Sequence, residues 1–79
     1  MIHFGLHLTR KEHAHFLAWA HENGVILYDS NKKQLDLEHV NGFIKMYWNW
    51  GTSSERTIVY GCNDDDFVVI KIKYNQAVI

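Results

Sequence analysis

The sequence predicts a small α+β domain, in which an antiparallel or mixed sheet of about four strands carries two helices on one face. The chain has 79 residues, which suits one domain because chains divide only at about two to three times this length. Some segments alternate apolar and polar residues with the period of a strand, and others have the longer period of a helix. In chain order they form the series β-α-β-α-β-β, so residues 1–79 are interpreted as a single domain.

The first 24 residues predict a strand followed by a helix. Apolar side chains alternate on one face of residues 2–8, at Ile2, Phe4, Leu6 and Leu8. Thr9 and Glu12 have the spacing of a capping box, in which each side chain accepts a hydrogen bond from the other residue's backbone N–H. The helix should begin here and end near Asn23, with Gly24 as its left-handed C-terminal residue. Its core-facing stripe is Phe16, Leu17 and Ala20, with His13 at the edge of the stripe.

The middle of the chain predicts a short buried strand over residues 25–29 and a turn over 30–34. The next residues are ambiguous, because 34–38 suit either the second strand of a hairpin or the start of a helix capped by an aspartate. We favour a helix from about Leu37 to Trp50, closed by the glycine that follows it.

The last third of the chain predicts an antiparallel hairpin. Residues 56–62 and 67–74 are rich in β-branched and aromatic side chains, which favour strands. The acidic segment 63–66 lies between them and is interpreted as a solvated hairpin tip, since it lacks the ligand spacing of a calcium loop. Residues 75–79 either extend the last strand or form an apolar tail that another surface must cover.

The helix predicted over residues 37–50 is apolar around about 200° of its circumference, which is wider than contact with one sheet requires. One stripe faces the core, and a second stripe is rotated by roughly 100–120°. The second stripe either packs against the first helix or meets a partner. Trp19 also lies about 100° from the core stripe of its own helix. Because exposed tryptophan and tyrosine anchor interfaces, the predicted partner-binding residues are Trp19, Phe43, Tyr47 and Trp50.

These features favour a small non-enzymatic protein-binding module, with a protein partner or a homodimer as the assembly. The formal charge is −1, so charge alone does not indicate nucleic acid or a membrane surface. Phosphate-loop, dinucleotide and nucleophile-elbow motifs are absent from the sequence, so no catalytic residue and no cofactor are predicted. In size, aromatic content and lack of a catalytic motif the chain is similar in style to small phage or mobile-element inhibitors of a host enzyme, the anti-CRISPR proteins among them.

A single-stranded nucleic-acid binder is the alternative function. On the predicted last strand Phe67, Lys71 and Lys73 share one face, and His3 and His7 could lie on the same open face of the sheet. Aromatic and basic side chains on an uncovered sheet stack bases and follow phosphates. The structural interpretation of the same pattern is a lysine-protected strand that discourages aggregation.

Metal and thiol chemistry have weaker support. The six histidines raise a further alternative, a metal-binding protein, but no pair has the helical i, i+4 spacing of a zinc protease, and no metal ligand is predicted. Cys62 is interpreted as a small buried hydrophobe rather than as a nucleophile.

The expected location is the cytoplasm. The chain has a single cysteine, which favours a reducing compartment. Its first residues lack the basic region of a signal peptide, and no apolar run approaches the ~18 residues that cross a bilayer. No membrane partner is expected.

Overall fold

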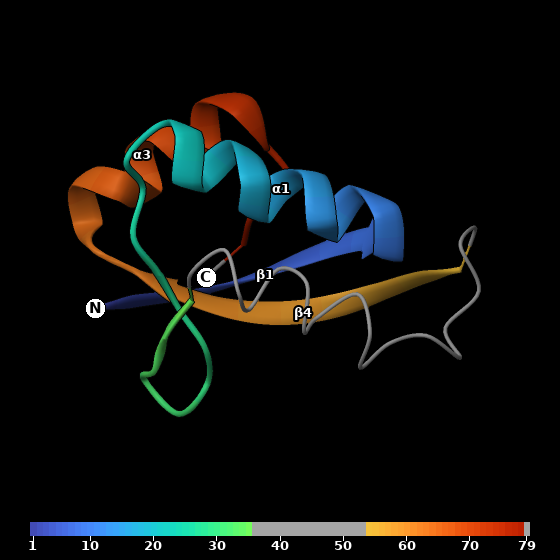
Figure 1. Cartoon of the computed structure of the whole chain (residues 1–79), viewed down its shortest axis with the longest axis horizontal. Helices are drawn as coiled ribbons and strands as arrows, with labels where there is room; N and C mark the ends of the chain where they lie inside the picture. Colours follow the sequence, from blue (N-terminus) through green and yellow to red (C-terminus); the bar gives the residue numbers. More distant parts are fainter. Residues whose placement is uncertain (36–53, 79) are drawn as a thin grey trace.

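The structure is a computed structural model that describes residues 1–35 and 54–78. In this part of the chain a four-stranded antiparallel sheet carries two helices, and both lie above the long strands in Figure 1. The predicted α+β class is confirmed. The elements in chain order are β1 (Ile2–Thr9), α1 (Arg10–Glu22), β2 (Leu27–Tyr28), β3 (Gln34–Leu35), β4 (Glu55–Cys62) and α3 (Asp64–Lys73).

The strands lie in the order β1-β4-β2-β3, and all described pairs are antiparallel. β1 and β4 pair along their whole length, from Ile2 opposite Cys62 to Thr9 opposite Glu55. The beginning of the chain and its last third therefore form the centre of the domain. β2 joins β4 through one pair, Tyr28 opposite Gly61.

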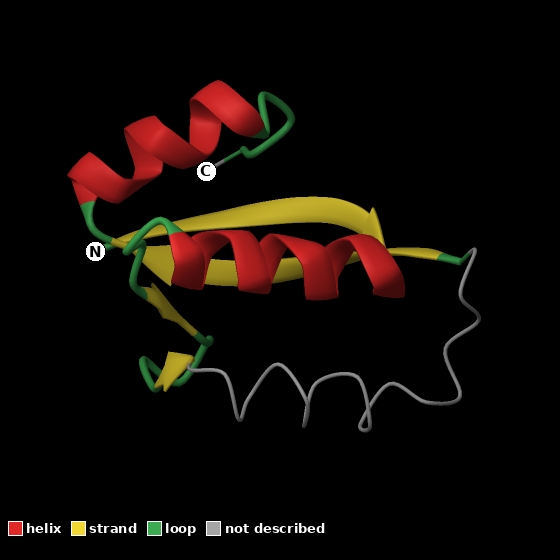
Figure 2. Ribbon diagram, turned by 45° about the horizontal axis from the view of Figure 1, so that its top comes forward, coloured by secondary structure: helices red, strands yellow, loops and turns green. Residues whose placement is uncertain are grey.

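The core lies between the sheet and both helices. Phe4 on β1 is buried, and its ring centroid lies 6.2 Å from that of Phe16 on α1 and 5.6 Å from that of Phe67 on α3. One side chain of the sheet thus touches both helices, which places them on the same face. Figure 2 shows α1 and α3 beside the β1–β4 pair. The alternation predicted for residues 2–8 is confirmed, because Phe4, Leu6 and Leu8 are all buried.

α1 has the boundaries and the core stripe that the sequence predicts. The Thr9 Oγ1 atom accepts a hydrogen bond from the Glu12 N–H at 3.2 Å, and Glu12 Oε1 accepts one from the Thr9 N–H at 3.1 Å. Gly24 follows the helix with a φ of 69°, a left-handed conformation that suits glycine. The buried residues are Phe16, Leu17, Ala20 and His13; His13 is fully buried rather than at the edge.

β2 and β3 form a hairpin, which is the alternative that was less favoured for residues 34–38, and the structure describes Gln34 and Leu35 of these residues. The Asp29 carboxylate closes the turn by accepting hydrogen bonds from the N–H groups of Asn31 at 2.8 Å and Lys33 at 2.9 Å. The turn is therefore confirmed, and so is a returning strand at Gln34–Leu35. The helix favoured for residues 37–50 lies outside the described residues.

The hairpin strand predicted for residues 67–74 is wrong, because these residues belong to helix α3 and its C-terminal end. Asn63 has extended φ and ψ angles of −75° and 159° and precedes three aspartates, which form the first helical turn rather than a hairpin tip. Aspartates at the N-terminus and lysines in the last turn both interact favourably with the helix dipole. Phe67, Ile70 and Tyr74 have helical spacing, and all three pack in or against the core.

The C-terminal residues lie along the outer edge of β1. The Gly5 N–H donates to the Val78 carbonyl at 2.9 Å, and Ala77 is fully buried. Lys71 Nζ donates to the Asn75 carbonyl at 2.7 Å and also to the Ala77 carbonyl. The tail does not extend a strand of residues 67–74, because those residues form a helix; Ala77 is buried, whereas Val78 is 66% exposed.

Candidate protein-binding surface

α3 presents an apolar surface to solvent. Val68, Val69 and Ile72 are 60%, 44% and 82% exposed. Residues three and four positions apart lie side by side on a helix, so Ile72 neighbours both valines. These three residues are called the α3 face below. The opposite side of the helix carries the core residues, which leaves the α3 face without a covering element among the described residues.

The composition of the α3 face is poorly suited to a solvent-exposed helix. Valine and isoleucine lose side-chain freedom against the preceding helical turn, so alanine, lysine or glutamate would stabilise an exposed helical position better. A helix of 10 residues is also too short to be stable by itself in water. Residues that disfavour the local secondary structure and do not improve packing often serve a function. Contact with a partner would be such a function here.

Opposite charges stand at the two ends of the α3 face. Asp64, Asp65 and Asp66 form the first turn of α3, and Lys71 and Lys73 lie in its last turn. Asp66 also accepts a long hydrogen bond, 3.4 Å, from the Ile26 N–H. The surface therefore has an apolar centre, a negative end and a positive end, which is a pattern that can orient a partner.

Trp19 lies beside the positive end of α3. Its ring centroid is 6.1 Å from that of Phe16 and 5.6 Å from that of Tyr74, and Lys73 Nζ lies 5.6 Å from the Trp19 ring. Trp19 is half-buried and packs against the core, so part of its ring has a structural role. Its contribution to partner binding stays a prediction. The other predicted contact residues, Phe43, Tyr47 and Trp50, lie outside the described residues.

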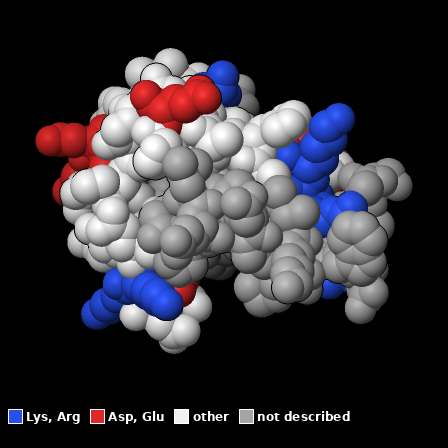
Figure 3. Space-filling view, viewed as in Figure 1, with Lys and Arg blue, Asp and Glu red and all other residues white. Residues whose placement is uncertain are grey.

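The three residues of the nucleic-acid alternative are not on an open sheet face. Phe67, Lys71 and Lys73 all belong to α3, and Phe67 packs against the core. His3 and His7 do lie on the sheet face that the described helices leave uncovered, and both are exposed. Figure 3 shows the described acidic and basic side chains in separate small groups.

His13 is a buried structural residue. Arg56 offers a backbone carbonyl at 3.0 Å from His13 Nε2, and a carbonyl only accepts, so Nε2 carries the proton. The Tyr60 hydroxyl lies 2.9 Å from Nδ1 and donates to it in the neutral ring. Burial lowers the pKa of His13 below its usual 6.5. Both ring nitrogens are engaged, which leaves neither for a metal or a substrate.

Cys62 is buried, as the sequence predicts. Burial raises the pKa of its thiol to about 11, and the negative charges of Asp66 and Asp64 act in the same direction. The reactive form of cysteine is the thiolate, so near neutral pH this side chain is almost entirely an unreactive thiol.

The exposed histidines of β1 do not form a metal site with the described residues. His7 Nε2 lies 3.2 Å from the Glu55 carboxylate, and His7 Nδ1 lies 2.9 Å from the Thr57 hydroxyl. Both His7 and Glu55 are more than half exposed, so their attraction is screened by water. No group of three potential metal ligands occurs in residues 1–35 and 54–78.

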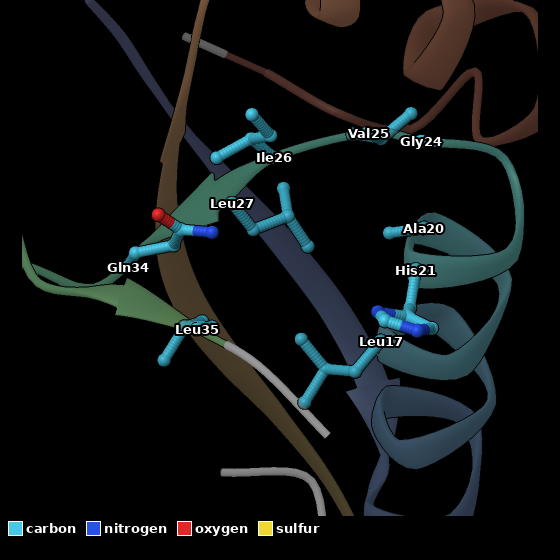
Figure 4. Close-up of a pocket in the computed structure, with 9 residues that line it drawn as sticks. All are labelled: Leu17, Ala20, His21, Gly24, Val25, Ile26, Leu27, Gln34 and Leu35. Atoms are coloured by element: carbon cyan, nitrogen blue, oxygen red, sulfur yellow. The ribbon is translucent and has the colours of Figure 1, made fainter. Parts of the chain in front are cut away.

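A cavity of about 260 Å³ lies between the end of α1 and the β2–β3 hairpin (Figure 4). Its apolar lining includes Leu17, Leu27 and Leu35, and His21 and Gln34 supply polar side chains. Its volume is below the ~300–1,000 Å³ of typical ligand pockets. The α3 face is therefore the stronger candidate for a functional site.

Comparisons with protein-family models, with curated proteins and with solved structures give no match for this chain. In the described part of the chain no helix has the length and apolar character needed to cross a membrane.

Sequence reasoning missed the α3 face because it assigned Val68, Val69 and Ile72 to a strand. One signal could have identified the helix. Asn63 and the three aspartates have the composition of a helix start, and the lysines near residue 72 suit a helix end. The β-branched residues between them outweighed this signal in the prediction.

Proposed function

We propose that this chain is a small non-enzymatic protein-binding domain and that the α3 face is a contact surface. The observation that carries the proposal is the presence of three adjacent, large and exposed aliphatic side chains on one short helix. Exposed apolar patches with a polar rim are typical of protein interaction sites. The charged ends of α3 supply such a rim.

The chemistry of the described residues supports binding rather than catalysis. The thiol of Cys62 is buried and protonated, and both nitrogens of His13 are engaged within the core. A nucleophile needs an adjacent base and access to its substrate. Neither of these two buried groups meets both requirements.

The aromatic residues Phe43, Tyr47 and Trp50 remain a second predicted contact surface. Inhibition of a host enzyme is one form that such binding would take. The size and composition of the chain support this finer proposal.

A selection from displayed peptides tests the proposed surface. A library of amphipathic helical peptides is selected for binding to the wild-type domain, and the isolated peptides are then tested against Ile72→Asp. A charge at the centre of the α3 face would have to be buried without a partner, so we expect binding to fall at least about tenfold. Lys11→Glu, a change on the first turn of α1, is the matched control and should retain binding.

The outcomes separate this surface from others. Peptides that bind the wild type and the Lys11→Glu variant, but not Ile72→Asp, support the α3 face. Peptides that bind the wild type and both variants equally use another surface, and that result would overturn the proposal. Circular dichroism of each variant confirms that loss of binding does not reflect loss of fold.

A further inference from the structure

We infer that the α3 face binds a second copy of this chain, with the two α3 helices packed antiparallel about a two-fold axis. This inference rests on the proposed function, since it uses the same surface and names its partner. It follows from the distribution of charge and apolar side chains along α3, which together determine the direction, the register and the strength of the contact.

The charges of α3 determine the direction of the two helices. In an antiparallel pair the acidic first turn of each helix lies beside Lys73 of the other, whereas the Lys71 ammonium donates to the Asn75 and Ala77 carbonyls of its own chain. A parallel pair would bring the acidic turns together and the lysines together, and like charges across an interface disfavour that arrangement. The sequence Asp64–Lys73 thus complements itself only when one copy is reversed.

The register follows from two-fold symmetry, which places the same patch on both copies. With the axis beside Val69, Asp65 lies four residues to one side and Lys73 four residues to the other, about 6 Å each along the helix. Asp65 is then level with Lys73 of the second copy, and this pair occurs twice. Val69 then lies opposite its equivalent at the axis, and Val68 and Ile72 of each copy flank this contact between the two ion pairs.

The expected strength follows from the size of the helix. A helix of 10 residues is about 15 Å long, so the α3 face is smaller than the ~800 Å² per partner of a standard stable interface. Weak and reversible dimerisation is therefore expected, with a dissociation constant in the micromolar range or above. Concentrations up to several hundred micromolar are needed to observe it.

A charge exchange tests the arrangement. Asp65→Lys alone places two lysines opposite each other at both symmetric positions, and Lys73→Glu alone places two acids there. Each variant should dimerise about 5–30-fold more weakly than the wild type, because two exposed attractive pairs become repulsive.

An equimolar mixture of the two variants restores both attractive pairs. In the heterodimer the lysine introduced at position 65 lies opposite the glutamate introduced at position 73. The unchanged Asp65 of one chain likewise lies opposite the unchanged Lys73 of the other. The heterodimer should therefore have close to wild-type affinity, and sedimentation equilibrium measures both variants and their mixture.

Controls keep the result specific to α3. Lys11→Glu changes the net charge as much as Lys73→Glu does, and its dimerisation should match that of the wild type within about twofold. Thermal unfolding followed by circular dichroism shows whether each variant folds. If Asp65→Lys does not fold, Asp65→Asn and Lys73→Gln replace the pair, and each should weaken dimerisation by about 2–5-fold.

Each outcome bears on one proposal or on both. A wild-type chain that stays monomeric at several hundred micromolar overturns the second copy as partner, while the peptide selection still decides whether the α3 face binds other proteins. Self-association that Ile72→Asp leaves unchanged overturns the α3 face as the contact between the two copies, and the peptide selection again decides whether this face binds other proteins. Weakened single variants whose mixture shows no recovery overturn the antiparallel arrangement. Recovery in the mixture supports it.

Discussion

The two described helices pack on the same sheet face and yet differ in how their sequences specify a helix. α1 begins with a complete capping box and is built largely from residues that tolerate or favour helical conformation. α3 contains four β-branched residues in its sequence DDDFVVIKIK, and the Asn63 side chain makes no described hydrogen bond to cap it. Local sequence therefore accounts for α1 but not for α3.

The difference shows what holds α3 in place. Its helical state depends on charges at its ends and on the contacts of Phe67, Ile70 and Tyr74 with the core. Tertiary packing overrides local preference when a segment gains more from burial than it loses in propensity. The exposed side chains of α3 are not stabilised by that burial. Their apolar character therefore indicates contact with a partner.

The largest expected effect tests the shared core between the helices. Phe16 on α1 is fully buried, and its ring lies within 6.2 Å of the rings of Phe4, Trp19, Tyr60 and Tyr74. Phe16→Ala should lower the free energy of unfolding by about 3–5 kcal/mol. A core of this size supplies about the same amount, so the variant should be largely unfolded in circular dichroism at 25 °C.

His15→Ala is the matched control for Phe16→Ala. His15 is exposed on the same helix, and its replacement should change the free energy of unfolding by less than about 0.5 kcal/mol in urea titrations. If Phe16→Ala remained as stable as this control, α1 would not be anchored through the aromatic cluster.

The next effect concerns pH and the one histidine that α1 buries. The pKa of His13 is lowered by burial in the folded chain and is near 6.5 in the unfolded chain. Below about pH 6.5 the unfolded chain therefore binds more protons, so the free energy of unfolding should fall as the pH falls from about 6.5. Above that pH His13 is neutral in both states and should contribute no pH dependence.

Urea titrations at several pH values between about 5 and 8 measure this dependence. His15→Gln removes an exposed histidine from the same helix and should leave the acid-side slope nearly as in the wild type. His13→Gln should reduce that slope even though it lowers stability overall. An unchanged slope in His13→Gln would mean that another group controls the response to acid.

The helix starts give the next smaller effect. Thr9→Ala removes the capping hydrogen bond of α1 and should cost about 0.5–2 kcal/mol. Asn63→Ala removes a side chain that makes no described capping bond in α3, so its cost should lie below that of Thr9→Ala. Urea titration of both variants gives the ranking. A larger loss in Asn63→Ala would show that Asn63 caps α3 in solution.

The same contrast explains how far the sequence could predict this structure. Alternation in residues 2–8, the capping box at Thr9 and the left-handed Gly24 are local signals, and each was confirmed. The pairing of β1 with β4 joins segments that are far apart in the chain, and no local pattern encodes it. For residues 67–74 the local pattern favours a strand, whereas the structure has a helix in which Phe67, Ile70 and Tyr74 pack in or against the core.

The candidate site was harder to predict than the fold. The predicted contact residues are all aromatic, and three of the four are tryptophan or tyrosine, which are common in interfaces. The α3 face contains only aliphatic residues, and their exposure follows from the helical conformation that the prediction missed. Trp19, by contrast, is partly buried and packs against the core.

The smallest expected change distinguishes a contact residue from a structural one. Ile72 is 82% exposed, so Ile72→Ala removes little buried area, and alanine has the higher helix propensity by a few tenths of a kcal/mol. The free energy of unfolding of the monomer, measured in urea at low protein concentration, should stay the same or rise by that amount.

Dimerisation of Ile72→Ala should weaken severalfold in sedimentation equilibrium, because each dimer loses the apolar contact twice. Ala18→Val introduces a β-branched side chain on α1 and should lower stability slightly without weakening dimerisation. A residue whose removal improves the fold and impairs association is kept for binding. If Ile72→Ala instead lowered stability by more than about 1 kcal/mol and left association intact, Ile72 would be a packing residue, and the distinction drawn between α1 and α3 would fail at its most exposed position.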